Sequence, residues 1–100
     1  MDVTCKLKFE TEAQAFWVKI GQEDLTFVTD TASFTTIVGE DRYMAWGVAG
    51  ESETSYKITI SPPSVYEVRT VGKHPVEGRI PKTTNSTAST RRFYIRKKKS

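Results

Sequence analysis

A two-residue period in hydrophobicity is the feature that most restricts what this chain can fold into. Residues 3–9, VTCKLKF, alternate apolar and polar side chains without a break, which predicts a half-buried β-strand with Lys6 and Lys8 facing solvent. Comparable segments recur about every 8 to 12 residues and are separated by Gly, Asp and Ser turns. The further strands predicted in this way cover residues 15–20, 25–29, 34–38, 42–49, 56–60 and 65–71.

This pattern predicts an all-β fold, a single small antiparallel β-sandwich of about seven strands, with a C-terminal strand that follows a flexible loop. The length of 100 residues fits one domain. Met44, Trp46 and Val48 share one face of segment 42–49, so we expect Trp46 at the centre of the core. A tryptophan in a central strand and a tyrosine in a following one resemble immunoglobulin-like sandwiches over residues 3–71, although paired cysteines are absent. This resemblance implies an architecture and no particular function.

Residues 15–20 admit two interpretations. Thr11 and Gln14 have the spacing of a helix capping box, which would start a short helix. The sequence AFWVKI, however, alternates and is rich in aromatic and β-branched residues, which favour a strand. We expect a strand here, with the short helix as the alternative.

Three regions of different composition follow one another along the chain. Residues 1–71 form the predicted sandwich body, and residues 72–90 are predicted to be a flexible loop because Gly and Pro interrupt a polar, Ser/Thr-rich run. Residues 91–100, RRFYIRKKKS, are predicted to be a basic C-terminal strand and tail within the same domain. The division also separates charge: residues 1–68 hold five Lys/Arg and eleven Asp/Glu, a net of −6, whereas residues 69–100 hold ten Lys/Arg and one Glu, a net of +9.

The basic segment is the first candidate contact site. If it is extended, Phe93 and Ile95 lie on one face and can dock on the sandwich, while Arg92, Tyr94 and Arg96 lie on the other. Arginine can bind phosphates, tyrosine can stack on a base, and the terminal lysines add salt-sensitive attraction. The candidate contacts for a ligand or polyanion are Arg91, Arg92, Tyr94, Arg96, Lys97, Lys98 and Lys99.

Two interpretations without a ligand compete with this one. Lysine and arginine commonly guard an exposed edge strand against pairing with another sheet. The basic segment can also associate with the acidic body of the same chain, through surface ion pairs of about 0 to 1 kcal/mol each. Trp17 is a separate candidate, because an exposed indole would anchor a protein or sugar ligand, whereas a packed one would cover a neighbouring strand.

Catalytic and metal-binding constellations are not apparent in the sequence. The chain has one cysteine, Cys5, which the alternation places in the core, and one histidine, His74, in a loop where we expect solvent exposure. The acidic pairs Glu23–Asp24 and Glu40–Asp41 fall in predicted turns, where such residues are favoured. We therefore expect no enzyme activity, no cofactor and no metal site.

The function predicted from these observations is a non-catalytic binding or interaction module whose ligand is another protein or an assembly. The alternative is nucleic-acid binding through the basic C-terminal segment. No stretch of the sequence is long and apolar enough to span a bilayer, and no signal segment is visible, so a soluble, cytoplasmic protein is expected. The protein partner is not identified by the sequence.

Overall fold

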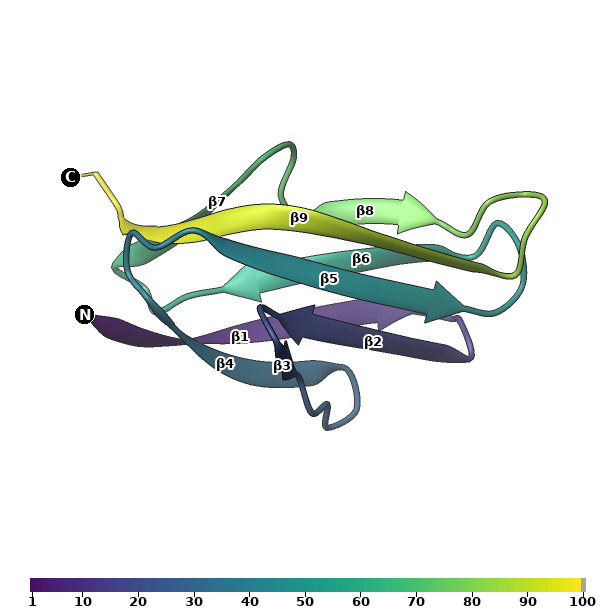
Figure 1. Cartoon of the computed structure of the whole chain (residues 1–100), viewed down its shortest axis with the longest axis horizontal. Helices are drawn as coiled ribbons and strands as arrows, with labels where there is room; N and C mark the ends of the chain where they lie inside the picture. The colour runs from purple at the N-terminus through teal and green to yellow at the C-terminus, as the bar shows by residue number, and fades with distance from the viewer. Residues whose placement is uncertain (100) are drawn as a thin grey trace.

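The chain folds into two antiparallel β-sheets that pack face to face (Figure 1). The computed structural model describes residues 1–99, and this range contains nine strands and no helix. One sheet has the order β4-β1-β6-β8, formed by β4 (Thr31–Ile37), β1 (Asp2–Thr11), β6 (Ser55–Ser61) and β8 (Val76–Arg79). The other has the order β3-β2-β5-β9-β7, formed by β3 (Glu23–Asp24), β2 (Ala15–Ile20), β5 (Arg42–Ala49), β9 (Ser86–Lys97) and β7 (Tyr66–Thr70). The predicted all-β sandwich is confirmed, with nine strands in place of about seven.

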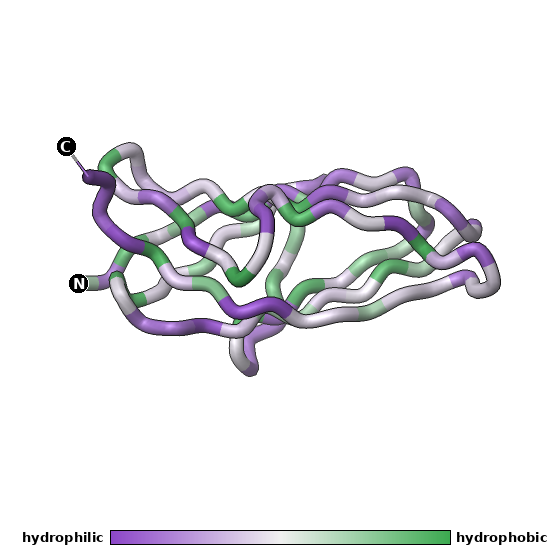
Figure 2. The backbone as a smooth tube through the Cα atoms, turned by 90° about the horizontal axis from the view of Figure 1, so that it is seen from above, coloured by the Kyte–Doolittle hydropathy of each residue, from purple (hydrophilic) through white to green (hydrophobic). Residues whose placement is uncertain are grey.

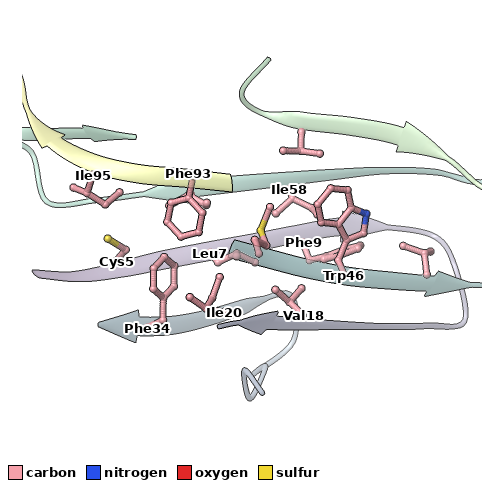
Figure 3. Packing of buried hydrophobic residues seen from close by; sticks show 14 of the residues in the cluster. Cys5, Leu7, Phe9, Val18, Ile20, Phe34, Trp46, Ile58, Phe93 and Ile95 are labelled. Carbon is pink, nitrogen blue, oxygen red and sulfur yellow. The ribbon is translucent and has the colours of Figure 1, made fainter. Parts of the chain in front are cut away.

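The core lies between the sheets and follows the predicted alternation. On β1 every second residue is buried, and hydrophobic and hydrophilic positions alternate along the strands in Figure 2. Trp46 is 2% exposed and lies among core side chains of both sheets, as predicted (Figure 3). Phe34 of β4 meets Phe93 of β9 edge to face, with ring centroids 5.8 Å apart, so the C-terminal strand is locked onto the opposite sheet. Cys5 is fully buried, also as predicted, and burial raises its pKa to about 11.

The segment between residues 15 and 37 is where the strand predictions need most correction. Residues 15–20 form β2, so the helix alternative is wrong. Residues 25–29 were predicted as a strand but contain only an isolated bridge from Val28 to Thr31, because the chain here crosses from one sheet to the other. The predicted turn at Glu23–Asp24 is instead the short strand β3, and β4 begins at Thr31, three residues before the predicted start.

Residues 72–90 are more regular than the predicted flexible loop. They contain β8, which pairs with β6, and the first five residues of β9, which pair with β5. The Ser/Thr-rich sequence gives no sign of the start of β9, because residues 86–90 have almost no apolar side chain on either face of the strand. Its backbone bonds to β5 supply the order that side-chain burial does not, and the predicted C-terminal strand therefore begins at Ser86 instead of residue 91.

Candidate functional site

The outer face of the five-stranded sheet carries the largest share of the predicted contact residues. We define this face by the side chains that alternate with the core positions on four of its strands. They are Ala15, Trp17 and Lys19 on β2, Tyr43, Ala45, Gly47 and Ala49 on β5, Ser86, Ala88, Thr90, Arg92, Tyr94 and Arg96 on β9, and Glu67 and Arg69 on β7. The predicted alternation of β9 is confirmed, because Phe93 and Ile95 are buried while Arg92, Tyr94 and Arg96 lie on the opposite side.

One end of this face is built from small residues around Trp17. Trp17 and Gly47 are directly opposite each other on β2 and β5, and the indole lies over the glycine, which is buried beneath it. The other side of the indole stays open, and 47% of Trp17 is exposed. An open hollow beside it is lined by small side chains that include Ala49, Ser86 and Ala88. Trp17 therefore packs on a neighbouring strand and presents an aromatic surface at the same time.

The middle of the face is formed by Tyr43, Arg92 and Val71. Tyr43 is 60% exposed and lies opposite Arg92 in the β5–β9 ladder. Val71, just beyond the end of β7, is 59% exposed and donates its N–H to the Arg92 carbonyl over 3.1 Å. These three residues line an open hollow together with Thr90 and Arg91. Tyr43 and Val71 were not among the predicted contacts, although the strict alternation around Met44 already placed Tyr43 on the side away from the core.

The far end of the face mixes charges of both signs. Arg69 lies opposite the half-buried Tyr94, and both line a small hollow with Asp41. The Arg96 guanidinium donates to the Glu67 carboxylate over 2.6 Å. This hydrogen bond holds the pKa of Glu67 below its usual value and raises the pKa of Arg96. Arg96 is thus already paired within the chain, as the interpretation of an intramolecular partner expected.

The remaining predicted contacts do not join this face. Arg91 alternates to the other side of β9, where its guanidinium donates to the Lys73 carbonyl over 3.0 Å. Lys97 lies on the same side as the buried residues of β9, at the end of the strand, and the N–H of Lys98 donates to the Val65 carbonyl. The three lysines of residues 97–99 are exposed but sit at one end of the sandwich. Of the seven predicted contacts, only Arg92, Tyr94 and Arg96 project from this face, although Arg91 also lines the hollow beside Arg92.

The single histidine serves the fold and is not a free loop residue, which corrects the expectation of solvent exposure. His74 is half-buried, and its Nε2 accepts a hydrogen bond from the Ile60 N–H over 3.0 Å. Burial lowers the pKa of His74, which favours the neutral form that can accept this bond. Within residues 1–99, no group of three or more His, Cys, Asp or Glu residues is placed to hold a metal ion.

Comparison of the chain with protein-family models, with curated proteins and with solved structures gives no significant match. The described part of the chain also contains no helix that could cross a membrane. The chemistry of the surface itself must therefore support any functional proposal.

Proposed function

We propose that this chain is a non-catalytic binding module of immunoglobulin-like architecture that engages another protein through the outer face of its five-stranded sheet. The observation that carries the proposal is the grouping of Trp17, Tyr43 and Arg92 on one uncovered sheet face. Tryptophan, tyrosine and arginine are the residue types that most often dominate the binding energy of protein interfaces. A cytoplasmic location stays a prediction of the sequence.

The shape of the face supports this assignment. Tyr43 projects from a surface whose neighbours toward Trp17 are Ala45, Gly47 and Ala88, so the two aromatic side chains stand over a floor of small residues. Such a floor lets a partner side chain approach the backbone closely and pack beside the rings. The aromatic centre with a charged periphery is the usual arrangement of a protein interface.

The distribution of charge favours a protein over a nucleic acid. Arg69 and Arg92 lie close to Asp41, and Arg96 is neutralised by Glu67. A surface that binds a polyanion gains affinity from many unpaired cations, because each phosphate contact releases counterions. A surface that carries charges of both signs instead suits a protein partner with a complementary pattern of charges.

Nucleic-acid binding remains the second candidate because of one specific arrangement. Tyr43 faces Arg92 across β5 and β9, and Tyr94 faces Arg69 across β9 and β7, so aromatic and guanidinium groups alternate in both directions. Single-stranded nucleic acids bind such patterns by stacking and phosphate contacts. Titrating labelled protein with a mixed-sequence single-stranded oligonucleotide, at low and near-physiological salt, decides between the candidates. Amide shifts at Arg92 and Tyr94 that persist at the higher salt would favour this candidate over a protein ligand.

The protein-binding proposal is tested by site-specific photocross-linking. A benzoylphenylalanine at position 43 is expected to give a discrete adduct in an extract of the source cells, competed away by unlabelled wild-type chain. The double variant Tyr43→Ser, Arg92→Ser should fold, by its amide NMR spectrum, but should not compete. The control places the same photoreactive group at Lys57, which is exposed on the outer face of the other sheet. Equal adducts at both positions, or equal competition by the double variant, would refute the proposal.

A further inference from the structure

The four edge strands of the two sheets differ in how well they are protected against pairing with another strand. Strand β3 has two residues, both acidic. Strand β8 has four residues with Glu77 and Arg79, and β7 has five residues with Glu67 and Arg69. Shortness and charge are the usual means of blocking a sheet edge. Strand β4, with the sequence TASFTTI, has seven residues without a charge, a proline or a glycine.

The direction of the β4 backbone groups identifies which ones face away from the sheet. The Val38 N–H donates to the Met1 carbonyl, and the Asp30 carbonyl accepts from the Phe9 N–H, so even-numbered residues turn toward β1. Odd-numbered residues of β4 therefore direct their N–H and C=O groups to the open edge. For Ser33 and Thr35, these groups have no partner among the residues that the structure describes.

The open stretch has two defined ends. At its start, the backbone N–H and C=O of Thr31 are already paired, because Thr31 exchanges both hydrogen bonds with Val28, at 2.9 and 3.2 Å. At its end, the Ile37 carbonyl accepts from the Glu40 N–H over 3.1 Å, and the chain turns away. A strand that adds to this edge can consequently pair only with residues 33–37, and Thr35 lies at their centre.

We propose that the occupant of this edge is a second copy of the same chain, paired antiparallel through β4 about a two-fold axis at Thr35. In this register Thr35 lies opposite Thr35 of the second copy, and Ser33 lies opposite Ile37. The N–H groups of Ser33, Thr35 and Ile37 on one copy then each face a carbonyl on the other, and the Ile37 carbonyl, which accepts from Glu40 with one lone pair, accepts from Ser33 with its second. A register centred on Phe34 is blocked, because Ile37 of the second copy would lie opposite Thr31, where Val28 already sits.

The charges on the neighbouring strand are compatible with the same register. In the β1–β4 ladder, Lys6 lies beside Ser33 and Asp2 lies beside Ile37. Pairing Ser33 with Ile37 therefore puts Lys6 of each copy in the same cross-strand row as Asp2 of the other. The two charges in each row are three strand spacings apart, about 14 Å, so their attraction is weak, and no like charges face each other in these two rows. The pairing also covers Ile37, which is 43% exposed in the single chain.

The assembly is a continuous eight-stranded sheet made of the four-stranded sheets of two copies. The assembly leaves the outer face of the five-stranded sheet free in both copies, so the pairing does not depend on the proposed protein-binding function. A dimer presents this face twice, which doubles the number of sites for the proposed partner. A contact through five residues of one strand buries less surface than the roughly 1,200 Å² of a stable interface, so the two copies associate reversibly.

Sedimentation equilibrium and amide NMR spectra, recorded from micromolar to millimolar concentration, test the proposal. We expect mass to rise with concentration and the amide signals of Ser33, Thr35 and Ile37 to shift most. Thr35→Lys and Thr35→Pro should each weaken association about tenfold or more, because they introduce a charge or remove a central N–H. The matched control is Thr4→Lys, which adds the same charge at the cross-strand neighbour of Thr35 on the central strand β1 and should leave association nearly unchanged.

A cross-linking measurement tests the register directly. Opposed residues in a hydrogen-bonded antiparallel pair have Cα atoms about 5.5 Å apart, which a disulfide can span. Thr35→Cys should therefore form a covalent dimer under mild oxidation, whereas Thr4→Cys should not, and the native Cys5 is buried. A mass independent of concentration, association that survives both Thr35 substitutions, or equal cross-linking of both cysteine variants would each overturn the proposal. Binding of an extended foreign peptide to β4, without self-association, would also overturn it.

Discussion

The contact between Trp17 and Gly47 can be tested by adding a single methyl group. A Cβ atom built on Gly47 would lie 2.5 Å from Cε2 and 2.9 Å from Cζ2 of the Trp17 indole, and closer still to Nε1. Favourable carbon contacts need about 3.5 Å, so the ring in a Gly47→Ala variant must move by roughly 1 Å or more. Because β5 is a central strand, its backbone cannot move aside, and the indole has to lift off the sheet.

The expected cost follows from the area that the indole covers. Trp17 is 47% exposed, so about half of its surface, of the order of 125 Å², is in contact with the sheet. At about 25 cal/mol per Å² this contact contributes at most about 3 kcal/mol. Lifting the ring loses part of that, while alanine in a strand gains about 0.5 to 1 kcal/mol over glycine. Gly47→Ala should therefore lower the free energy of unfolding by about 1 to 2 kcal/mol.

A double-mutant cycle measured by urea denaturation gives a sharp criterion. In a Trp17→Ala background the three atoms nearest to the new methyl are removed, so Gly47→Ala should change sign and stabilise the protein by about 0.5 to 1 kcal/mol. The buried Trp46 reports unfolding by fluorescence in all four proteins. If Gly47→Ala costs the same with and without the indole, the packing of Trp17 on Gly47 is not the cause, and the reasoning fails.

Three further predictions concern titratable groups. Burial lowers the pKa of His74 below 6.5 in the folded chain, so the unfolded chain binds its proton more readily; stability should be complete above pH about 6.5 and decrease as the pH falls from there toward the folded pKa. His74→Gln should remove this step from the dependence of Tm on pH, and an unchanged profile would show that His74 is not the group responsible. The thiol of Cys5, with a pKa of about 11, should react with a disulfide reagent at pH 8 only as fast as the chain unfolds, and rapid labelling of the native state would contradict its burial. Arg96→Gln should raise the pKa of Glu67 toward its usual 4.5 in an NMR titration of the side-chain carboxyl, whereas no change would mean that the hydrogen bond does not form in solution.

Strands with a clear hydrophobic face were predictable, and strands held mainly by backbone pairing were not. The alternation in residues 3–9 and at Phe93 and Ile95 is itself the cause of their burial, because a two-residue period matches the pleat. Residues 25–29 carry the same pattern, yet Leu25 and Phe27 reach the core from a crossover between the sheets. Residues 86–90 show the opposite case, because this polar segment becomes a strand through backbone pairing with β5.

The candidate site likewise contains relations that the sequence predicted and relations that it did not. The sequence indicated that Arg92, Tyr94 and Arg96 share one side of a strand, since that relation is local. It did not indicate that Tyr43 and Val71 would lie beside Arg92, because these contacts depend on which strands are neighbours. It indicated an acidic partner for the basic segment within the same chain, but not that Glu67 would pair with Arg96, because that ion pair exists only where β7 and β9 are adjacent.

Within the strands that it predicted, local periodicity thus determined which residues are buried and which are presented to solvent, because both depend only on the geometry of a single strand. Strand order, the open edge at β4 and the grouping of Trp17, Tyr43 and Arg92 on one face were decided by the tertiary structure. These features arise from pairing between segments far apart in sequence, and many pairings would bury the same alternating side chains equally well.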